Sequence, residues 1–328
     1  MKLRTSSISR HRNRGLSLIE LMVSLVIGLV LMIAVVSAYL GSSGATRMAE
    51  AQARMNEDAQ AALTVLTQQL RMAGNNPKQP YYTSGAPRNP VYDNTTYIVR
   101  GCDGRFSDIT SAANIQSLTC VAGGGAAPDS IAVSYEADPF NTIPTSAGIP
   151  TDCLGQGLPT LTDSVSVWDG IPTVPPIPVV SVPTNVTFTV ADNRFYVGTS
   201  TAVVTPSLYC KGNGGANPQA LVENIEDLQF VYGTAATTST PSSLAVAGYL
   251  SAGDIPTDLA SMPTDPARWA QVLTVRICVV VRSERPVVSD AASAQYLQCD
   301  GTLNTTPPDL HLRRAYSTTV VLRNRVPS

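Results

Sequence analysis

The chain opens with a short basic stretch and then changes abruptly to a long apolar run. Residues 16–40, LSLIELMVSLVIGLVLMIAVVSAYL, contain a single charged side chain, Glu20. About 20 apolar residues in a helix are enough to span a bilayer, so this run predicts a membrane-spanning helix. A carboxylate costs roughly 2.5–3.5 kcal/mol at the membrane centre. Glu20 is therefore a candidate functional residue.

A second helical pattern follows, in which apolar side chains recur mostly at steps of three and four residues. They are Met48, Met55, Ala59, Ala62, Leu63, Leu66, Leu70 and Ala73. This spacing predicts that 41–76 continue the first helix as an amphipathic helix with one buried face. Gly74, Asn75, Asn76 and Pro77 are predicted to end it. The glycines at 41 and 44 mark either an ordinary membrane exit or a place where the helix can bend or locally melt on assembly.

Beyond residue 77 the pattern changes to short strands. Strands are predicted at 130–136, 186–190, 194–197, 227–232, 272–281 and 318–322, with a hairpin turn at 191–193 and a turn or short helix at 221–227. Two stretches rich in Pro, Thr, Gly and Ser, 137–183 and 234–266, are predicted to be loops or insertions. The fold class expected is α+β: a long N-terminal helix packed on an antiparallel β-sheet in a large head, 77–328, with the insertion 137–183.

Composition and charge place the bulk of this chain outside the cytoplasm. Charged residues make up only 14% of its 328 residues, and it holds 23 Gly and 24 Pro, which is typical of a β-rich exported domain with long loops. Basic residues before the apolar run mark the cytoplasmic side, so the head is expected to face outward. Loss of the five basic residues in 1–15 takes the formal net charge from −2 to −7. That sign argues against a nucleic-acid partner.

Six cysteines all lie beyond the apolar run: Cys102, Cys120, Cys153, Cys210, Cys278 and Cys299. An even number in an outward-facing domain favours disulfides. Fifteen connectivities are open to six cysteines, and we favour pairing between sequence neighbours, 102 with 120, 153 with 210, and 278 with 299. A metal site is the weaker alternative, because no C-x-x-C spacing occurs.

Residues that would support catalysis are scarce, so an enzyme is not expected. The two histidines are His11, in the leader, and His311, which is expected to be an ordinary surface residue. No P-loop and no G-x-S-x-G motif is present. Calcium bound by the scattered Asp103, Asp108 and Asp129 has no EF-hand spacing to support it. We expect no cofactor and no metal.

The N-terminal residues carry a resemblance to a known signal. The leader 1–15 contains Lys2, Arg4, Arg10, Arg12 and Arg14, ends in Gly15, and precedes Glu20 by five residues. This order resembles the prepilin signal of type IV pilins and type II secretion pseudopilins. The resemblance implies that the prepilin peptidase cuts between Gly15 and Leu16 and methylates Leu16, although Leu stands there in place of the usual Phe.

Two ordinary explanations of the same segment remain. A cleaved secretory signal is disfavoured because the apolar run is too long for its apolar region. A plain signal anchor explains the length and the basic flank but gives no reason for Glu20. In the resembled family the corresponding Glu pairs with the N-terminal amine of a neighbouring subunit. Such pairing would offset the cost of a buried carboxylate and fix the axial register of packed helices.

Patches of the head look like the PilW-type minor pilins. They are 70–77 (LRMAGNNP), 221–233 (LVENIEDLQFVYG), 275–283 (VRICVVVRS) and 316–325 (YSTTVVLRNR). This resemblance implies a minor pilin with a type IV pilin-like fold that primes pilus assembly and lies at or near the tip. Other minor pilins, the major pilin, the prepilin peptidase and the inner-membrane assembly platform are the implied partners. Twitching motility and adhesion would be properties of the pilus.

The same resemblance implies a location. Before assembly the protein would be held in the bacterial inner membrane by a single pass through the lipid bilayer, with its head in the periplasm, and after assembly it would be on the cell surface. Two alternatives remain for its role. One is a minor pseudopilin of a type II secretion system, and the other is a membrane-anchored adhesin whose ligand would bind in 137–183.

Overall fold

A computed structural model describes residues 17–76, 96–121, 127–168, 181–235, 245–255 and 265–325, with backbone alone at 163–168 and 181–184. The leader, Gly15 and Leu16 lie outside the described residues, as do 174–180 of the proline-rich stretch. The chain divides into two compact units, Met1–Glu50 and Ala51–Ser328. One helix, α1 (Leu18–Met72), contributes residues to both units.

The first unit consists of the apolar part of α1. The helix continues without interruption through Gly41 and Gly44, and a Cβ atom added at either glycine would meet nothing within 4 Å. Serine hydroxyls in this part donate to backbone carbonyls one turn earlier, as Ser37 does to Ile33 at 2.8 Å. The helix is thus continuous at 41–44 in the isolated chain, and bending or melting there on assembly stays a prediction.

In the second unit, the amphipathic part of α1 buries the face that its spacing predicts. Met55, Ala59, Ala62, Leu66 and Leu70 are all at most 1% exposed. The helix ends at Met72, and Gly74 then adopts a φ of 68°, a left-handed conformation that glycine accepts without strain. The Asn324 side chain donates to the carbonyl of Ala73 at 3.1 Å and to the two before it. The predicted helix end is confirmed.

The first sheet contains six antiparallel strands. They are β1 (Val99–Cys102), β2 (Ser130–Ala137), β3 (Thr160–Trp168), β4 (Ser181–Gly198), β5 (Ser207–Lys211) and β6 (Gln219–Glu223). Their order is β1-β2-β4-β5-β6, and β3 pairs with the first half of β4. A 3-10 helix, η3 (Ile115–Ser117), begins at an Asn114 cap.

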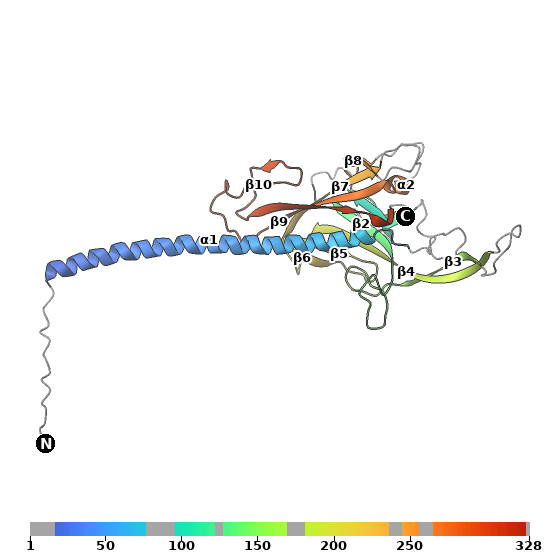
Figure 1. Ribbon diagram of the computed structural model, residues 1–328, viewed down its shortest axis with the longest axis horizontal. Helices are drawn as coiled ribbons and strands as arrows, with labels where there is room; N and C mark the ends of the chain where they lie inside the picture. The colour runs from blue at the N-terminus through green and yellow to red at the C-terminus, as the bar shows by residue number, and fades with distance from the viewer. Residues whose placement is uncertain are drawn as a thin grey trace, which may run out of the picture. The chain divides into compact units, whose positions relative to one another are not determined.

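Two predictions for this region are wrong. The residues 191–193 form no hairpin turn, because β4 runs through them without interruption and pairs with β2 there. The stretch 137–183 is not loop throughout. Its second half contains β3 and the start of β4, which pair from Thr160 with Thr189 to Trp168 with Ser181 and form a long ribbon that extends from the sheet (Figure 1).

The second sheet contains four antiparallel strands in the order β12-β9-β7-β8. They are β7 (Ile225–Ala235), β8 (Val246–Leu250), β9 (Val272–Arg282) and β12 (Arg313–Val321), and the short helix α2 (Asp265–Trp269) precedes β9. A two-stranded sheet, β10 (Tyr296–Leu297) with β11 (Leu303–Asn304), lies between β9 and β12 in the chain. A 3-10 helix, η4 (Arg323–Arg325), follows β12.

The strands predicted at 227–232 and 272–281 are confirmed as β7 and β9, and residues 318–321 of the last predicted strand, 318–322, belong to β12. The turn or short helix expected at 221–227 is instead the end of β6, a single residue, Asn224, at a φ of 63°, and the start of β7. Strand β8 lies within 234–266, which was expected to be a loop. The α+β class is confirmed, although two large sheets replace the single sheet expected.

One apolar core joins these elements within the second unit. It includes Leu66 of α1, Tyr135 and Phe195 of the first sheet, and Phe230 and Val279 of the second, each at most 2% exposed. Figure 1 shows the last turns of α1 running alongside the strands of the head. The helix thus supplies the apolar side chains that both sheets share.

Three disulfides brace the head. Cys102 is bonded to Cys120, Cys153 to Cys210 and Cys278 to Cys299, and these are the sequence-near pairs favoured above. The first disulfide links the end of β1 to the 103–121 loop. The second links the loop after β2 to β5, and the third links β9 to the segment just after β10. No cysteine in the chain is free.

Candidate assembly site

The apolar half of α1 presents its side chains to the outside all the way round. Large apolar side chains from Leu18 to Leu40 are between 51% (Val36) and 79% (Leu18) exposed. Among the described residues, α1 is the helix that is long and apolar enough to cross a membrane, and none of its most apolar window is buried. A core helix of a soluble domain would be covered by its own chain. This one needs an apolar environment from outside the chain.

Glu20 is the exception within that surface. It is exposed, in the first turn of α1, where a negative side chain is favourable to the helix dipole. The Ser24 hydroxyl donates to the backbone carbonyl of Glu20 at 2.8 Å, so the helix itself supplies a partner for this hydroxyl. Among the described residues no salt bridge includes Glu20. In an apolar surrounding, its carboxylate would require a cation from elsewhere.

Polar contacts hold the second half of α1 to the head. Asn193 of β4 donates its side-chain amide to Gln69 at 2.7 Å and to the Tyr135 hydroxyl at 3.3 Å. The hydroxyl of Tyr316 on β12 donates to Asn56 at 2.6 Å. These contacts join α1 to both sheets along its length, so its register on the head is fixed by directional bonds as well as by apolar packing.

Two further contacts lie nearer the start of that segment. Asn224 donates to Asp58 at 3.2 Å, and burial raises the pKa of the Asp58 carboxyl more than this hydrogen bond lowers it. Arg54 pairs with Glu284 at 2.7 Å, with both side chains more than half exposed. The first contact is partly buried, whereas the second lies in water, where an ion pair contributes little.

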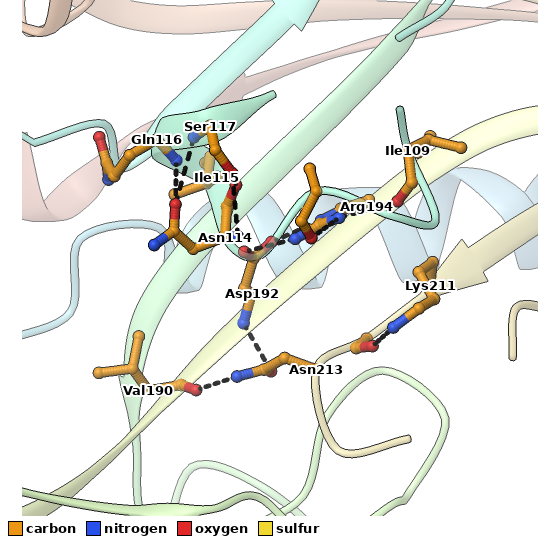
Figure 2. Close-up of polar contacts among 12 residues, drawn as sticks. Ile109, Asn114, Ile115, Gln116, Ser117, Val190, Asp192, Arg194, Lys211 and Asn213 are labelled. Carbon is orange, nitrogen blue, oxygen red and sulfur yellow. Dashed lines mark hydrogen bonds and ion pairs between the residues drawn. The ribbon is translucent and has the colours of Figure 1, made fainter. Parts of the chain in front are cut away.

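Figure 2 shows a buried ion pair within β4. Arg194 donates through Nε and Nη2 to the two oxygens of Asp192 at 3.1 and 3.0 Å, and both side chains are at most 6% exposed. Its Nη1 donates to the carbonyls of Ile109 and Ala112. The buried guanidinium is paired with a carboxylate and donates to two loop carbonyls, so it holds the 108–117 loop against the sheet.

Arg313 plays a similar part in the second sheet. Its guanidinium donates to both oxygens of Glu226 and, at 2.7 Å, to Asp309. Arg313 holds the pKa of the Asp309 carboxyl well below its usual range. His311 lies beside the same carboxylate, with its Nδ1 at 3.0 Å from Asp309. His311 therefore lies next to the Arg313–Asp309 ion pair.

The aspartates considered for calcium do not converge. Asp103 accepts from the backbone of Ala252 and Gly253, Asp108 accepts from Thr119, and Asp129 accepts from Gly104 and Phe230. Each carboxylate thus holds backbone in place. Within the described residues no three acidic, histidine or cysteine side chains are placed to hold a metal ion.

Asp129 differs from the other two because it joins the two sheets. Its oxygens lie 2.8 Å from the amide nitrogens of Gly104, after β1, and Phe230, on β7. The side chain is buried, and this burial raises the pKa of the carboxyl to about 7, despite the two amide donors. Asp129 is therefore a buried residue that joins the two sheets.

The sequence reasoning missed the polar anchors on β4. Asp192, Asn193 and Arg194 were placed in or beside a turn, because Asp and Asn favour turns. In the structure they alternate along a strand: Asp192 and Arg194 pair on one face, and Asn193 reaches α1 on the other. The available signal was the i, i+2 spacing of two opposite charges, which places them on the same face of a strand.

The comparisons with known families agree with this architecture. The family model for the Type IV Pilus-assembly protein W matches residues 194–324, from the end of β4 to η4. The Prokaryotic N-terminal methylation motif matches residues 10–36, which include Gly15, Leu16 and Glu20. No curated protein and no solved structure matched the chain. Pilin-family domains are structural rather than enzymatic, and the motif together with the apolar helix indicates membrane anchoring. The two matches support a type IV pilus minor pilin similar to the PilW family.

Proposed function

We propose that this chain is a minor pilin of a type IV pilus. It is made with a leader, 1–15, is cut between Gly15 and Leu16, and is methylated on Leu16 by the prepilin peptidase. Residues 16–40 then hold it in the inner membrane with the head, 77–328, in the periplasm. With other minor pilins it primes assembly of the pilus on the assembly platform and remains at or near the tip, where its neighbours include the major pilin.

The observation that carries this proposal is that the large apolar side chains of the first half of α1 are all more than half exposed. More than twenty residues of exposed apolar helix precede a segment whose apolar face is fully covered by the head. Such a surface is stable in lipid, or against equivalent helices of other subunits. One continuous helix therefore supports both stages, anchoring first and packing afterwards.

Glu20 supplies the register for that packing. After the cut, the amine of Leu16 would be a cation at the start of the apolar helix. The Glu20 carboxylate of one subunit and the Leu16 amine of its neighbour would neutralise one another at only one axial stagger. An unpaired carboxylate in the packed helices would cost several kcal/mol, so incorrect staggers are disfavoured.

The size of the head supports a place at an end of the filament. A head of about 250 residues, with a β3–β4 ribbon extending from its sheet, is difficult to repeat in a close-packed array. The match to a pilus-assembly family also favours a pilus over a type II secretion system.

Variants of Glu20 test the assembly step. We expect Glu20→Ala to be processed and to accumulate in the membrane, but to reduce surface pili by at least tenfold, since an uncompensated amine remains in the bundle. Glu20→Asp is the matched control, because it keeps the charge and should retain part of the function. Sheared pili and membrane fractions are quantified by immunoblot. Normal piliation by Glu20→Ala would contradict the charge-pairing role.

Labelling the head tests the position in the filament. A tag inserted at the exposed Val204 loop, detected with gold-conjugated antibody, should mark filament ends. Labels spaced evenly along filaments would contradict the tip position, and normal filament numbers in a strain that lacks the protein would contradict the priming role.

A further inference from the structure

Strand β12 lies at one end of the second sheet and has a strand neighbour on one side only among the described residues. It pairs with β9 over nine residues, from Arg313 with Arg282 to Val321 with Thr274, without a shift of register. The strands at the other ends of the two sheets, β1, β6 and β8, have only four or five residues each. Natural edge strands are commonly kept short, bulged, charged or interrupted by proline, which prevents further pairing. The edge of β12 is instead long and regular.

Two hydrogen bonds at the ends of the β9–β12 ladder show which residues of β12 face its open side. Leu322 donates its amide to the Leu273 carbonyl at 2.8 Å, and Ser283 donates its amide to the Leu312 carbonyl at 2.8 Å. In an antiparallel ladder, hydrogen-bonded pairs alternate with pairs whose backbone groups point away from each other. The even-numbered residues of β12 therefore bond to β9. The odd-numbered residues direct their N–H and C=O groups to the open side, and they are Ala315, Ser317, Thr319 and Val321.

These backbone groups have no hydrogen-bond partner within the part of the chain that the structure describes. The sequence around them, 315–322 (AYSTTVVL), contains no charged residue and no proline. The side chains of Ser317, Thr319 and Val321 are exposed. A row of donors and acceptors that recurs at every second residue matches the backbone of an extended segment. The open edge thus specifies a β-strand as its occupant.

A groove between β12 and α1 lies along the same edge. Its volume is about 740 Å³, and its lining includes Leu63, Arg71 and Met72 of α1 together with Ser317 and Thr318 of β12. When a strand is added to a sheet, the backbone hydrogen bonds supply affinity, and alternate side chains of the added strand enter pockets that supply specificity. The groove offers such a pocket on the side of the sheet that faces α1.

Basic side chains surround this edge. Arg71 lines the groove, while Arg314 and Arg323 lie at the two ends of the uncharged stretch, and all three are exposed. Among the described residues, none of the three belongs to a salt bridge, and no acidic residue lines the groove. An added strand with carboxylates at its ends would complement this charge.

The same charges disfavour a second copy of β12 as the occupant. Antiparallel pairing of two copies, centred on Thr318, would place Arg314 of each copy near Arg323 of the other. Like charges opposite each other destabilise a strand pair. The complementary strand therefore belongs to a different protein.

We propose that the open edge of β12 and the adjacent groove receive an extended segment of a different protein, which becomes a fifth strand of the second sheet. The segment consists of an uncharged stretch rich in β-branched residues with Asp or Glu at its ends. This inference concerns the head alone and does not require the role in pilus priming.

Photo-crosslinking in cells identifies the occupant. The full-length chain carries p-benzoyl-phenylalanine in place of Thr319, and the matched control carries it in place of Val204, which is 80% exposed in the loop between β4 and β5. We expect a discrete adduct with a different protein from position 319 and none from position 204. Its crosslinked peptide should be an uncharged, β-branched stretch flanked by carboxylates. The proposal is overturned by no adduct at position 319, by adducts with lipid, a second copy or the same chain alone, or by a peptide without flanking acids.

A synthetic peptide with the crosslinked sequence then tests whether backbone or side chains are recognised. Thr319→Pro removes one N–H from the open edge and leaves the bonds to β9, whereas Thr319→Ala is the matched control that keeps this N–H. We expect Thr319→Pro to weaken peptide binding roughly five- to tenfold and Thr319→Ala to change it by less than about twofold. Equal losses from the two variants would mean that side chains, not backbone, are recognised, and would overturn the proposal.

Hydrogen exchange of the wild-type protein supplies a measurement that needs no variant. The peptide should slow exchange at the amides of Ser317, Thr319 and Val321, while residues around Val204 exchange as before. This result decides the question if Thr319→Pro lowers the melting temperature. Unchanged exchange at these three amides in the presence of saturating peptide would overturn the proposal.

Discussion

The two halves of α1 are one helix with opposite relations to the rest of the chain. Leu31 in the first half is 61% exposed, whereas Leu66 in the second half is 1% exposed and belongs to the core. Both leucines favour helix equally. What differs is the neighbourhood: two sheets cover the apolar stripe of the second half, whereas none of the described residues buries the large apolar side chains of the first half.

The sequence already contains this difference. In the second half apolar residues form a stripe, and Arg54, Glu57 and Asp58 occupy other positions, which is the pattern of a helix on a protein core. In the first half apolar residues lie all round the helix. A helix of that kind is stable only in an apolar environment. The head therefore stabilises the second half of α1, whereas the first half requires a membrane or neighbouring subunits.

Leucine truncation in the two halves gives the largest expected effect on stability. Leu66→Ala should lower the free energy of unfolding of the head by about 2–5 kcal/mol, since it opens a cavity in a packed core. Leu31→Ala is the matched control and should leave that free energy unchanged. Denaturant unfolding of the detergent-solubilised chain, followed by tryptophan fluorescence, measures both. Equal destabilisation by the two variants would contradict the claim that only the second half of α1 is packed in the core of the head.

Removing a disulfide should affect the head alone. The Cys153–Cys210 bond closes a loop of 57 residues, and a cross-link of this size stabilises by about 2–4 kcal/mol. The double variant Cys153→Ala with Cys210→Ala should therefore lower the unfolding free energy by this amount, while insertion of the apolar helix into membranes is retained. Labelling of six free thiols in the native periplasmic protein would contradict the oxidised head.

The pH dependence of stability should come from the core of the head. Burial raises the pKa of Asp129 to about 7, above its unfolded value near 3.9. The stability that the protonated carboxyl contributes is therefore fully present below about pH 4 and is lost as pH rises through about 7, and a shift of about three pKa units corresponds to roughly 4 kcal/mol. Urea unfolding of the wild type from pH 4 to pH 8 should show this fall. Asp129→Asn should be less stable at low pH and should lack that part of the slope. An unchanged slope in this variant would contradict the assignment.

The smallest effect is expected from the exposed ion pair where α1 enters the head. Arg54 and Glu284 are 69% and 53% exposed at their side chains, so the pair contributes about 0–0.5 kcal/mol, less at high salt. Arg54→Ala should shift the midpoint of unfolding barely beyond error. A loss comparable with that of Leu66→Ala would mean that surface charge, not apolar burial, holds the helix to the head.

Much of the fold follows from local patterns that the sequence displays. The buried face of α1, its end at Gly74 and the strands β7 and β9 all have strong periodicity or clear stop residues, and each was predicted from these. The N-terminal motif was also visible, because its order of basic leader, glycine, apolar run and glutamate is local. These features can be predicted without knowing which elements contact one another in the fold.

The errors came where distant contacts override local preference. Asp192 and Asn193 favour turns by themselves, yet pairing with Arg194 and Gln69 holds them in a strand. The composition of 137–183 favours loops, yet β3 pairs along nine residues of β4. The division into two sheets depends on which strands meet, and no local signal encodes it. The open edge of β12 was likewise hidden, since sequence alone does not report which strand lies at the end of a sheet.

The most direct test of this account is the N-terminus of the chain recovered from sheared pili. Intact-protein and peptide mass spectrometry should find a polypeptide that begins at Leu16 with a methylated amine, in filaments that also contain the major pilin. A chain that retains residues 1–15, or begins elsewhere, or is absent from filaments of a piliated strain that expresses it, would contradict the claim that the exposed apolar helix is an assembly surface.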